Sequence, residues 1–241
     1  MKLTDAVWEK RNLGLTTAEI TVELGDTAEI LRERLPAVKA EYQVAKAPHG
    51  RMDLYFALQE QGFAFSEASI RVSHEIGTYK CPPLIERLLN KVSYEEMPDL
   101  VTMEHYIRKG MFQTDRVILD PFFTSEQAAE RYIGWMRDEQ ERGARLFHYT
   151  YQGAPIGFSC MRGNEEGEYY PVLGGIYPND KPLPFGMVIL YKQLDIARDL
   201  DGKRLYTYIS SNNLPVVKAY NQCGYSVEEV QYVFVKHEIR Q

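Results

Sequence analysis

The stretch that decides the fold runs from residue 205 to residue 235 and reads LYTYISSNNLPVVKAYNQCGYSVEEVQYVFV. It opens with apolar-rich β-forming residues, which predict a strand. Asn213 then stands at a typical N-cap position, and Pro215 falls in the first helical turn, where an N–H has no partner within the helix. Gly224 provides the left-handed residue that commonly ends a helix. Residues 227–235 follow as a second strand, so the stretch predicts a strand, a capped helix and a strand.

Residues of this stretch resemble the closing motif of the GNAT superfamily of acyl-CoA-dependent N-acyltransferases: Asn213, Val216, Tyr220, Gly224 and Tyr225. The resemblance implies that the asparagine contacts the pantetheine arm of CoA and that Tyr220 protonates the departing thiolate. Aminolysis of a thioester forms a tetrahedral oxyanion and expels a sulfur anion, to which a positioned phenol can donate its proton. The alternative is that Tyr220 is a core aromatic of an amphipathic helix.

Composition narrows the class of protein. A chain of 241 residues suits one large domain or two small ones. The net charge is −6 and the basic residues are dispersed, which argues against a nucleic-acid partner. The longest apolar run, around residues 187–191, is too short to cross a bilayer, and the first twelve residues contain no apolar signal core.

Cysteines and histidines give two further expectations. The three cysteines are widely spaced and form no CxxC pair, so we expect reduced thiols and a cytoplasmic location. The five histidines show no zinc-like spacing, so we expect no metal.

The first part of the chain repeats the pattern of the last part. Alternating residues predict strands over 18–24 and 38–44, Thr27 begins a short helix that ends before Pro36, and 50–61 reads as a helix closed by Gly62. A strand over 63–74 follows. If Gly62 is aligned with Gly224, then Phe63 meets Tyr225, Glu67 meets Glu229, Val72 meets Phe234, and Leu58 meets Tyr220.

The alignment indicates a degenerate internal repeat whose first copy lacks the proton donor. Coincidence is the alternative, because helix-ending glycines followed by strands are common. Residues 76–83 (IGTYKCPP) read as a boundary, so we expect an N-terminal α/β domain over 1–83 and a GNAT domain over 84–241. The expected fold is a GNAT-like mixed, mostly antiparallel sheet flanked by helices.

The resemblance also locates an acetyl-CoA site. The strand over 169–176 (YYPVLGGI) would offer edge N–H groups to the thioester carbonyl, unless Gly174-Gly175 is a β-bulge without a ligand. The following turn would hold the pyrophosphate at a helix N-terminus. Pro184 replaces the first glycine of the family pattern there and offers no N–H, which leaves room for another acyl carrier or a lost activity. The implied donor-binding residues are Leu173, Gly174, Gly175, Ile176, Lys181, Phe185, Gly186, Met187 and Asn213.

Several short features are similar to the dTDP-fucosamine acetyltransferases, a family that acylates the amine of a nucleotide-linked deoxysugar. They are Trp8 with Gly14 before a strand, LQEQGF over 58–63, Asp115-Arg116 before the helix with Tyr132 and Trp135, and NNLPVVKAYNQCGY over 212–225. In this fold Asp115 and Arg116 would border the acceptor pocket, with Arg116 clamping a phosphate or carboxylate. The alternative is a surface or interdomain ion pair.

The reaction also needs a base, because the nucleophile must be a neutral amine. Glu168 is the candidate, through a water molecule, and His148 is the second candidate on the acceptor side. The sequence therefore predicts an N-acetyltransferase acting on a small amine, most readily a nucleotide-linked amino sugar, with a homodimer left open. Rival interpretations are the same chemistry with another amine or acyl donor, and a catalytically silent GNAT-like binding module.

Overall fold

The computed structural model describes residues 1–77, 79–178 and 183–238. The described strands form one sheet in the order β1-β2-β3-β10-β4-β9-β8-β7-β6-β5, with antiparallel neighbours except for the parallel pairs β2–β3 and β8–β9. The mixed, mostly antiparallel fold class predicted from the sequence is confirmed. The strands are β1 (Lys2–Asp5), β2 (Thr17–Thr21), β3 (Tyr42–Pro48), β4 (Ala64–Glu75), β5 (Val92–Glu96), β6 (Arg145–Tyr151), β7 (Ala154–Gly163), β8 (Glu168–Ile176), β9 (Arg204–Ser210) and β10 (Ser226–His237).

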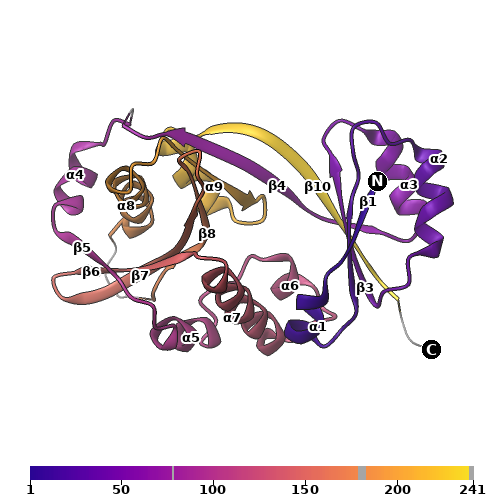
Figure 1. The fold of residues 1–241 in the computed structure, drawn as a ribbon, viewed down its shortest axis with the longest axis horizontal. Helices are drawn as coiled ribbons and strands as arrows, with labels where there is room; N and C mark the ends of the chain where they lie inside the picture. The colour runs from indigo at the N-terminus through magenta and orange to yellow at the C-terminus, as the bar shows by residue number, and fades with distance from the viewer. Residues whose placement is uncertain (78, 179–182, 239–241) are drawn as a thin grey trace.

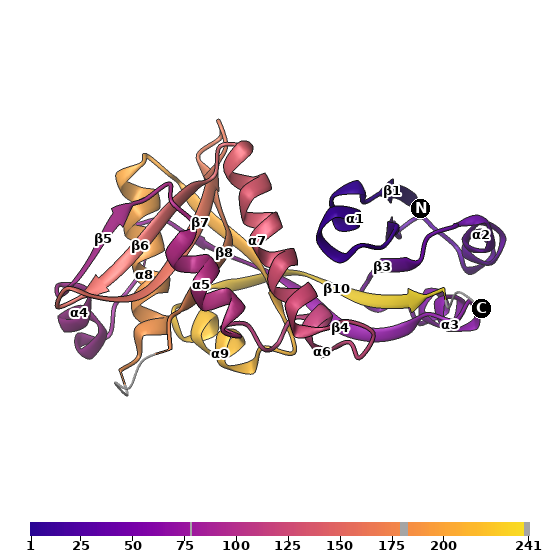
Figure 2. The same ribbon diagram turned by 90° about the horizontal axis from the view of Figure 1, so that it is seen from below.

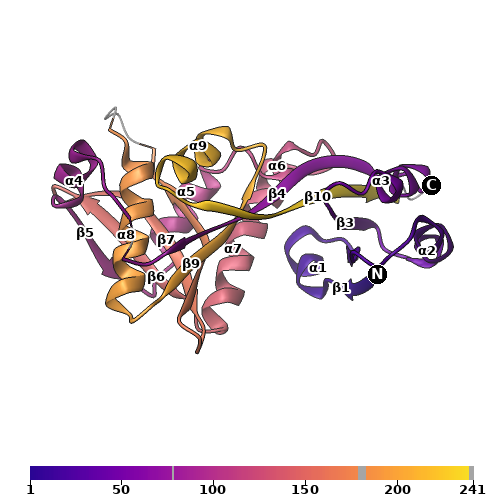
Figure 3. The same cartoon turned by 90° about the horizontal axis from the view of Figure 1, so that it is seen from above.

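Helices cover both faces of this sheet (Figures 1 to 3). Helices α5 and α7 lie below the sheet in Figure 1 and in front of it in Figure 2, whereas α8 and α9 lie in front in the view from above in Figure 3. The helices are α1 (Val7–Leu13), α2 (Ala28–Arg34), the 3-10 helix η1 (Leu35–Ala37), α3 (Met52–Glu60), α4 (Pro83–Leu89), α5 (Val101–Arg108), α6 (Arg116–Leu119), α7 (Ser125–Glu141), α8 (Phe185–Asp199) and α9 (Leu214–Gln222).

Local sequence signals set several of these boundaries. Thr124 and Gln127 form a capping box at the start of α7, in which each side chain bonds the backbone of the other residue. The expected turn at Gln152-Gly153 joins β6 to β7, and both residues have positive φ angles, of 53° and 78°. Gly224 ends the α9 segment with a φ of 81°, as the sequence predicts.

The internal repeat is visible in the elements themselves. Strand β3, helix α3 and strand β4 begin at residues 42, 52 and 64, whereas β9, α9 and β10 begin at 204, 214 and 226. Each element of the first set therefore begins and ends 162 residues before its counterpart. This is the register that aligns Gly62 with Gly224, so the repeat predicted from the sequence is confirmed, with Leu58 standing where Tyr220 stands.

The two copies exchange their last strands. Strand β10 lies between β3 and β4, and β4 lies between β10 and β9. Strands β4 and β10 run side by side from the N-terminal lobe, which contains β1 to β3 and α1 to α3, to the second lobe, which contains β5 to β9 and α4 to α9 (Figure 1). The division into 1–83 and 84–241 stays a prediction, and the sheet runs across it, because β4 of the first segment pairs with two strands of the second.

The lobes also share a core and polar contacts. Residues of the N-terminal part pack with α6, α7 and β10 in one apolar cluster, which contains Leu13, Tyr42, Val44, Val117, Phe123, Ala128 and Val233. Arg11 on α1 donates to Asp138 on α7 at 2.6 Å, and His237 contacts Asp120 at 2.8 Å. We infer that α1 and the first strands are held firmly against the second lobe.

The sequence missed or misplaced some elements. The strand expected over 38–44 begins only at Tyr42, because Leu35–Ala37 forms a 3-10 turn and residues 38–41 lead out of it. Strand β1 and helices α1, α4 and α6 are short, at four to seven residues, which is too few for a clear period. No helix among the described residues is long and apolar enough to span a membrane, and those residues contain no group of three potential metal ligands.

Candidate functional site

Strands β8 and β9 part soon after they begin, which opens a gap in the middle of the sheet. They pair only at Glu168 with Arg204 and at Tyr169 with Leu205. At the point of parting, the Thr207 hydroxyl donates to the carbonyl oxygen of Pro171 at 2.8 Å. Beyond it, the edge of β8 that faces β9 has no strand partner, so its backbone groups are available to a ligand.

A β-bulge lies at this same point. On the other side of β8, Leu173 pairs with Cys160 and Pro171 pairs with Met161, which leaves Val172 without a partner of its own. A bulge turns the local backbone and is common beside active sites. The sequence allowed a bulge at Gly174-Gly175, but the structure places it at Val172. Pro171 was the available signal, since proline inside a strand is largely confined to edges and bulges.

A cavity of about 960 Å³ occupies the gap and extends under the N-terminal lobe. Its volume is at the upper end for small-molecule sites. The second lobe contributes residues including Met111, Phe112, Asp115, Arg116, Arg131, Tyr132, Trp135, Leu173, Gly174, Gly175, Ile176, Gly186, Gln193, Asn213 and Tyr220. The N-terminal part contributes Trp8, Glu9, Asn12, Glu19, Thr21, Lys46, Glu67 and Ser69.

Helix α9 presents Asn213 and Tyr220 to this cavity. The Asn213 side-chain oxygen accepts the N–H of Val216 at 3.3 Å, which confirms it as the N-cap. Tyr220 is 7% exposed and packs edge-on against Tyr225, with 4.7 Å between ring centroids. Burial raises the pKa of Tyr220 above that of a free tyrosine, so it is a protonated phenol at neutral pH. The structure therefore brings the predicted proton donor to the gap.

Gly174 and Gly175, which were predicted to bind the cofactor, leave room for side chains that pack on the two faces of β8. A Cβ added at Gly175 would collide with the Met111 side chain and lie 3.2 Å from Phe112, whereas one at Gly174 would lie 3.3 Å from Gln193 Nε2. The absence of side chains lets residues 111–112 cover the strand from one side and Gln193 approach it from the other. Gln193 is 2% exposed, and its Oε1 has no hydrogen-bond partner among the described residues.

Of the residues predicted to bind the cofactor at the N-terminus of α8, only some face the cavity. Pro184 precedes the helix without a side-chain cap, and Gly186 lines the cavity. Phe185 is 1% exposed and packs against Tyr151 in the core, and neither it nor Met187 is among the cavity-lining side chains. Their first-turn N–H groups still belong to the helix end that attracts anions. Lys181 lies outside the described residues.

Asp115 and Arg116 line the cavity at the junction of the lobes. Asp115 caps α6 by accepting the N–H of Val117 at 2.8 Å, and its Oδ2 lies 3.8 Å from Arg131. Arg116 lies 3.6 Å from the Glu67 carboxylate, which also accepts a hydrogen bond from the Ser210 hydroxyl. These contacts hold both residues in the cavity wall.

The two predicted bases lie elsewhere. Glu168 is the first residue of β8, where the strands are still paired, and accepts from Arg204 at 3.1 Å. His148 lies on β6, which β7 separates from β8, and is within 3.2 Å of the Tyr177 hydroxyl. Burial lowers the pKa of His148. Neither residue is among those lining the cavity, so the base role of each stays a prediction without support from position.

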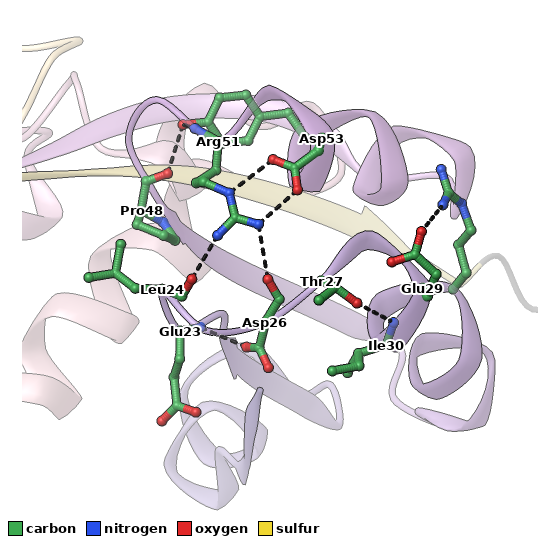
Figure 4. A network of polar contacts seen from close by, with 11 residues as sticks. Glu23, Leu24, Asp26, Thr27, Glu29, Ile30, Pro48, Arg51 and Asp53 are labelled. Carbon is green, nitrogen blue, oxygen red and sulfur yellow. Dashed lines mark hydrogen bonds and ion pairs between the residues drawn. The ribbon is translucent and has the colours of Figure 1, made fainter.

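The first repeat has no equivalent gap. Strands β2 and β3 stay paired from Thr17 with Tyr42 to Thr21 with Lys46, and Arg51 stands where Asn213 stands in the second repeat. The Arg51 guanidinium donates to the carbonyl oxygens of Leu24 and Asp26, at 2.7 and 3.0 Å (Figure 4). In the order of elements, this loop before α2 corresponds to the segment before α8, and it is occupied by the chain's own cation.

The chain matches no protein-family model and none of the curated proteins by sequence. Among solved structures it is similar to a conserved Staphylococcus epidermidis protein of unknown function, with a TM-score of 0.63 and 11% identity over 96% of this chain and 89% of that one. It is also similar to a GCN5-related N-acetyltransferase from Sphaerobacter thermophilus, with a TM-score of 0.55 and 11% identity over 87% of this chain and 64% of that one. A third similar structure is a tandem GNAT protein from the clavulanic acid biosynthesis pathway, with a TM-score of 0.53 and 11% identity over 93% of this chain and 76% of that one. These likenesses show that the chain has the GNAT fold.

Proposed function

We propose that the protein is an N-acetyltransferase that moves an acetyl group from acetyl-CoA to the amine of a small acceptor. The observation that carries the proposal is the gap between β8 and β9, which is lined by Tyr220 on one side and by the free edge of β8 on the other. In the GNAT fold this is where a thioester can lie between two strands.

The reaction follows from this arrangement. The neutral amine attacks the thioester carbonyl carbon, and the oxyanion that forms is stabilised by N–H groups of β8 near the Val172 bulge. The carbon–sulfur bond then breaks, and the Tyr220 hydroxyl gives its proton to the CoA thiolate. The proton of the attacking amine leaves to water or to a base, for which Glu168 remains the sequence-based candidate. The products are the amide and free CoA thiol.

The finer proposal is that the acceptor is a nucleotide-linked amino sugar. It is supported by the short motifs that resemble dTDP-fucosamine acetyltransferases and by the size of the cavity, which combines tryptophan and tyrosine rings with buried charges. Cytoplasmic location is proposed with it, and the free thiols Cys81, Cys160 and Cys223 are consistent with a reducing compartment.

The test is release of CoA thiol from acetyl-CoA with a panel of amines that includes nucleotide-linked amino sugars, simple amino sugars and amino acids. We expect thiol release above the no-acceptor rate with at least one amino-sugar nucleotide. Acetyl-CoA should also raise the melting temperature, because a ligand selective for the folded state stabilises it. If acetyl-CoA neither stabilises the protein nor releases thiol with any amine, the silent binding module with a Pro184-altered turn is the better interpretation.

A further inference from the structure

Arg116 is a buried cation with unused hydrogen-bonding capacity. Its side chain is 12% exposed, and its ion-pair partner, Glu67 Oε1, is 3.6 Å away. Its Nε is buried and has no hydrogen-bond partner among the described residues. A guanidinium carries five N–H donors, and buried donors in folded proteins are nearly always satisfied.

The neighbouring Arg131 shows what a satisfied arginine looks like in the same environment. It is also 12% exposed, but its Nε donates to Glu9 at 2.8 Å, and Asp115 lies 3.8 Å from its Nη1. Arg131 therefore holds α7 against α1, whereas Arg116 lines the cavity, and its Nε has no hydrogen-bond partner among the described residues.

Lys46 is a second cation of this kind, on β3 of the N-terminal part. It lines the same cavity, and its ammonium forms no hydrogen bond or ion pair within the part of the chain that the structure describes. Burial lowers the pKa of Lys46, and Arg116 and Arg131 lower it further, against the opposing charge of Glu19. The buried Tyr42 hydroxyl lies beside Arg116, and the two side chains interact. Glu67 and Glu19 lie near these cations, but no acceptor of a described residue is within hydrogen-bond distance of the Arg116 Nε or the Lys46 ammonium, and such donors favour an incoming anion.

We propose that Arg116 and Lys46 bind an anionic oxygen group of the acceptor, a carboxylate or a phosphate, at the end remote from the reacting amine. This proposal rests on the proposed function only in assigning the bound molecule the role of acceptor. The degenerate repeat, which has no donor gap of its own, thereby provides half of the acceptor site.

The sheet order bears on the length of this acceptor. Strand β3 is three strands away from β9, with β10 and β4 between them. At a spacing of about 4.8 Å between strands, Lys46 on β3 lies on the order of 14 Å from β9, whereas Arg116 contacts Glu67, which bonds Ser210 at the end of β9. For an acceptor that reaches Lys46, this separation favours an amine joined to its anion through a ring over an α-amino acid, whose amine and carboxylate share one carbon.

The direct test measures anion binding without catalysis. Inorganic phosphate and acetate are titrated separately into the protein with CoA already present, so that the α8 terminus is occupied, and NaCl at equal ionic strength is the reference. We expect at least one of the two anions to bind the wild type, and Arg116→Gln and Lys46→Gln each to weaken that binding about tenfold or more. The exposed Arg137→Gln and Lys10→Gln variants are matched controls and should bind as the wild type does.

The outcomes separate the two proposals. Equal anion binding by wild type, Arg116→Gln and Lys46→Gln, or no binding above the NaCl reference, overturns the anion site whether or not acetyl-CoA is a substrate. Lys46→Gln keeps the test decisive if Arg116→Gln does not fold. In the thiol-release assay, Lys46→Gln should raise KM for anionic acceptors and leave KM for neutral amines unchanged; an equal effect on both would also overturn it. Preference for phosphate or for acetate identifies which oxyanion the acceptor carries.

Discussion

Arg51 and Asn213 occupy the same position in the two repeats, each directly before a helix that begins at residue 52 or 214, but their side chains do opposite things. Asn213 caps its own helix and borders an open gap. Arg51 reaches back and bonds two backbone carbonyls of the loop before α2, and it also pairs with Asp53 at 2.7 Å (Figure 4). One copy of the repeat therefore keeps an open cavity beside its helix, whereas the other fills the equivalent place with its own side chain.

The proposed acid role of Tyr220 gives the first prediction. Tyr220→Phe removes only the hydroxyl, so we expect kcat to fall by about 100-fold or more while acetyl-CoA affinity stays within about twofold. Thiol-release kinetics and a calorimetric titration measure the two quantities. Tyr94→Phe is the control, because the Tyr94 hydroxyl bonds Asp199 at 3.0 Å and is not among the cavity-lining side chains. Undiminished kcat in Tyr220→Phe would assign the tyrosine to the core alone.

Buried tyrosines predict loss of stability in alkali. Burial raises the pKa values of Tyr149, Tyr170, Tyr177, Tyr191 and Tyr220 above the ordinary value of 10.0. Above pH 10 the unfolded chain releases these protons while the folded protein keeps them, so the unfolded state binds fewer protons and the free energy of unfolding falls as pH rises. Urea unfolding between about pH 8 and pH 11 should show this decline beginning near pH 10. A free energy that stays constant to pH 11 would contradict it.

The ion pair between Glu9 and Arg131 joins α1 to α7, and we expect it to stabilise the contact between the two lobes. Both side chains are buried, and the Glu9 Oε1 to Arg131 Nε distance is 2.8 Å. Removing one partner leaves the other charged and buried, so Glu9→Ala and Arg131→Ala should each destabilise the protein by about 3–5 kcal/mol. The double variant should cost less than the sum of the two. Denaturant unfolding measures all three, and strict additivity would show that the residues do not interact.

The close packing at Gly157 gives a prediction for the contact between β7 and β8 beside the gap. A Cβ at this position would collide with the carbonyl oxygen of Gly175 and lie 2.6 Å from Ile189 Cδ1. Gly157→Ala should therefore cost about 1–3 kcal/mol of stability and lower kcat/KM by displacing β8. Gly25→Ala is the matched control, since no heavy atom lies within 4 Å of the added Cβ. Wild-type stability in Gly157→Ala would mean that the strands yield there.

The repeat and the second lobe were predictable from sequence because both depend on local signals. The glycine that ends a helix and the asparagine that caps one are recognised from the residues next to them. Tyr220 could be placed for the same reason, since its distance along α9 from Asn213 is fixed by helical geometry.

The charged end of the cavity could not be predicted in that way. Glu9, Lys46 and Glu67 come from three distant segments, and strand exchange between β4 and β10 is what brings Glu67 beside Arg116. His148 and Glu168 are titratable residues on β6 and β8, which made them candidate bases from the sequence. The positions of these residues in the paired strands keep both away from the cavity lining.

The most direct test of the account counts acetyl-CoA sites by calorimetric titration of the wild-type protein. Because β8 and β9 part while β2 and β3 remain paired, and because Arg51 fills the first repeat's loop, we predict saturable binding with one acetyl-CoA per chain. Two sites per chain would contradict the closure of the first repeat, and no binding would contradict the acetyl-CoA site itself.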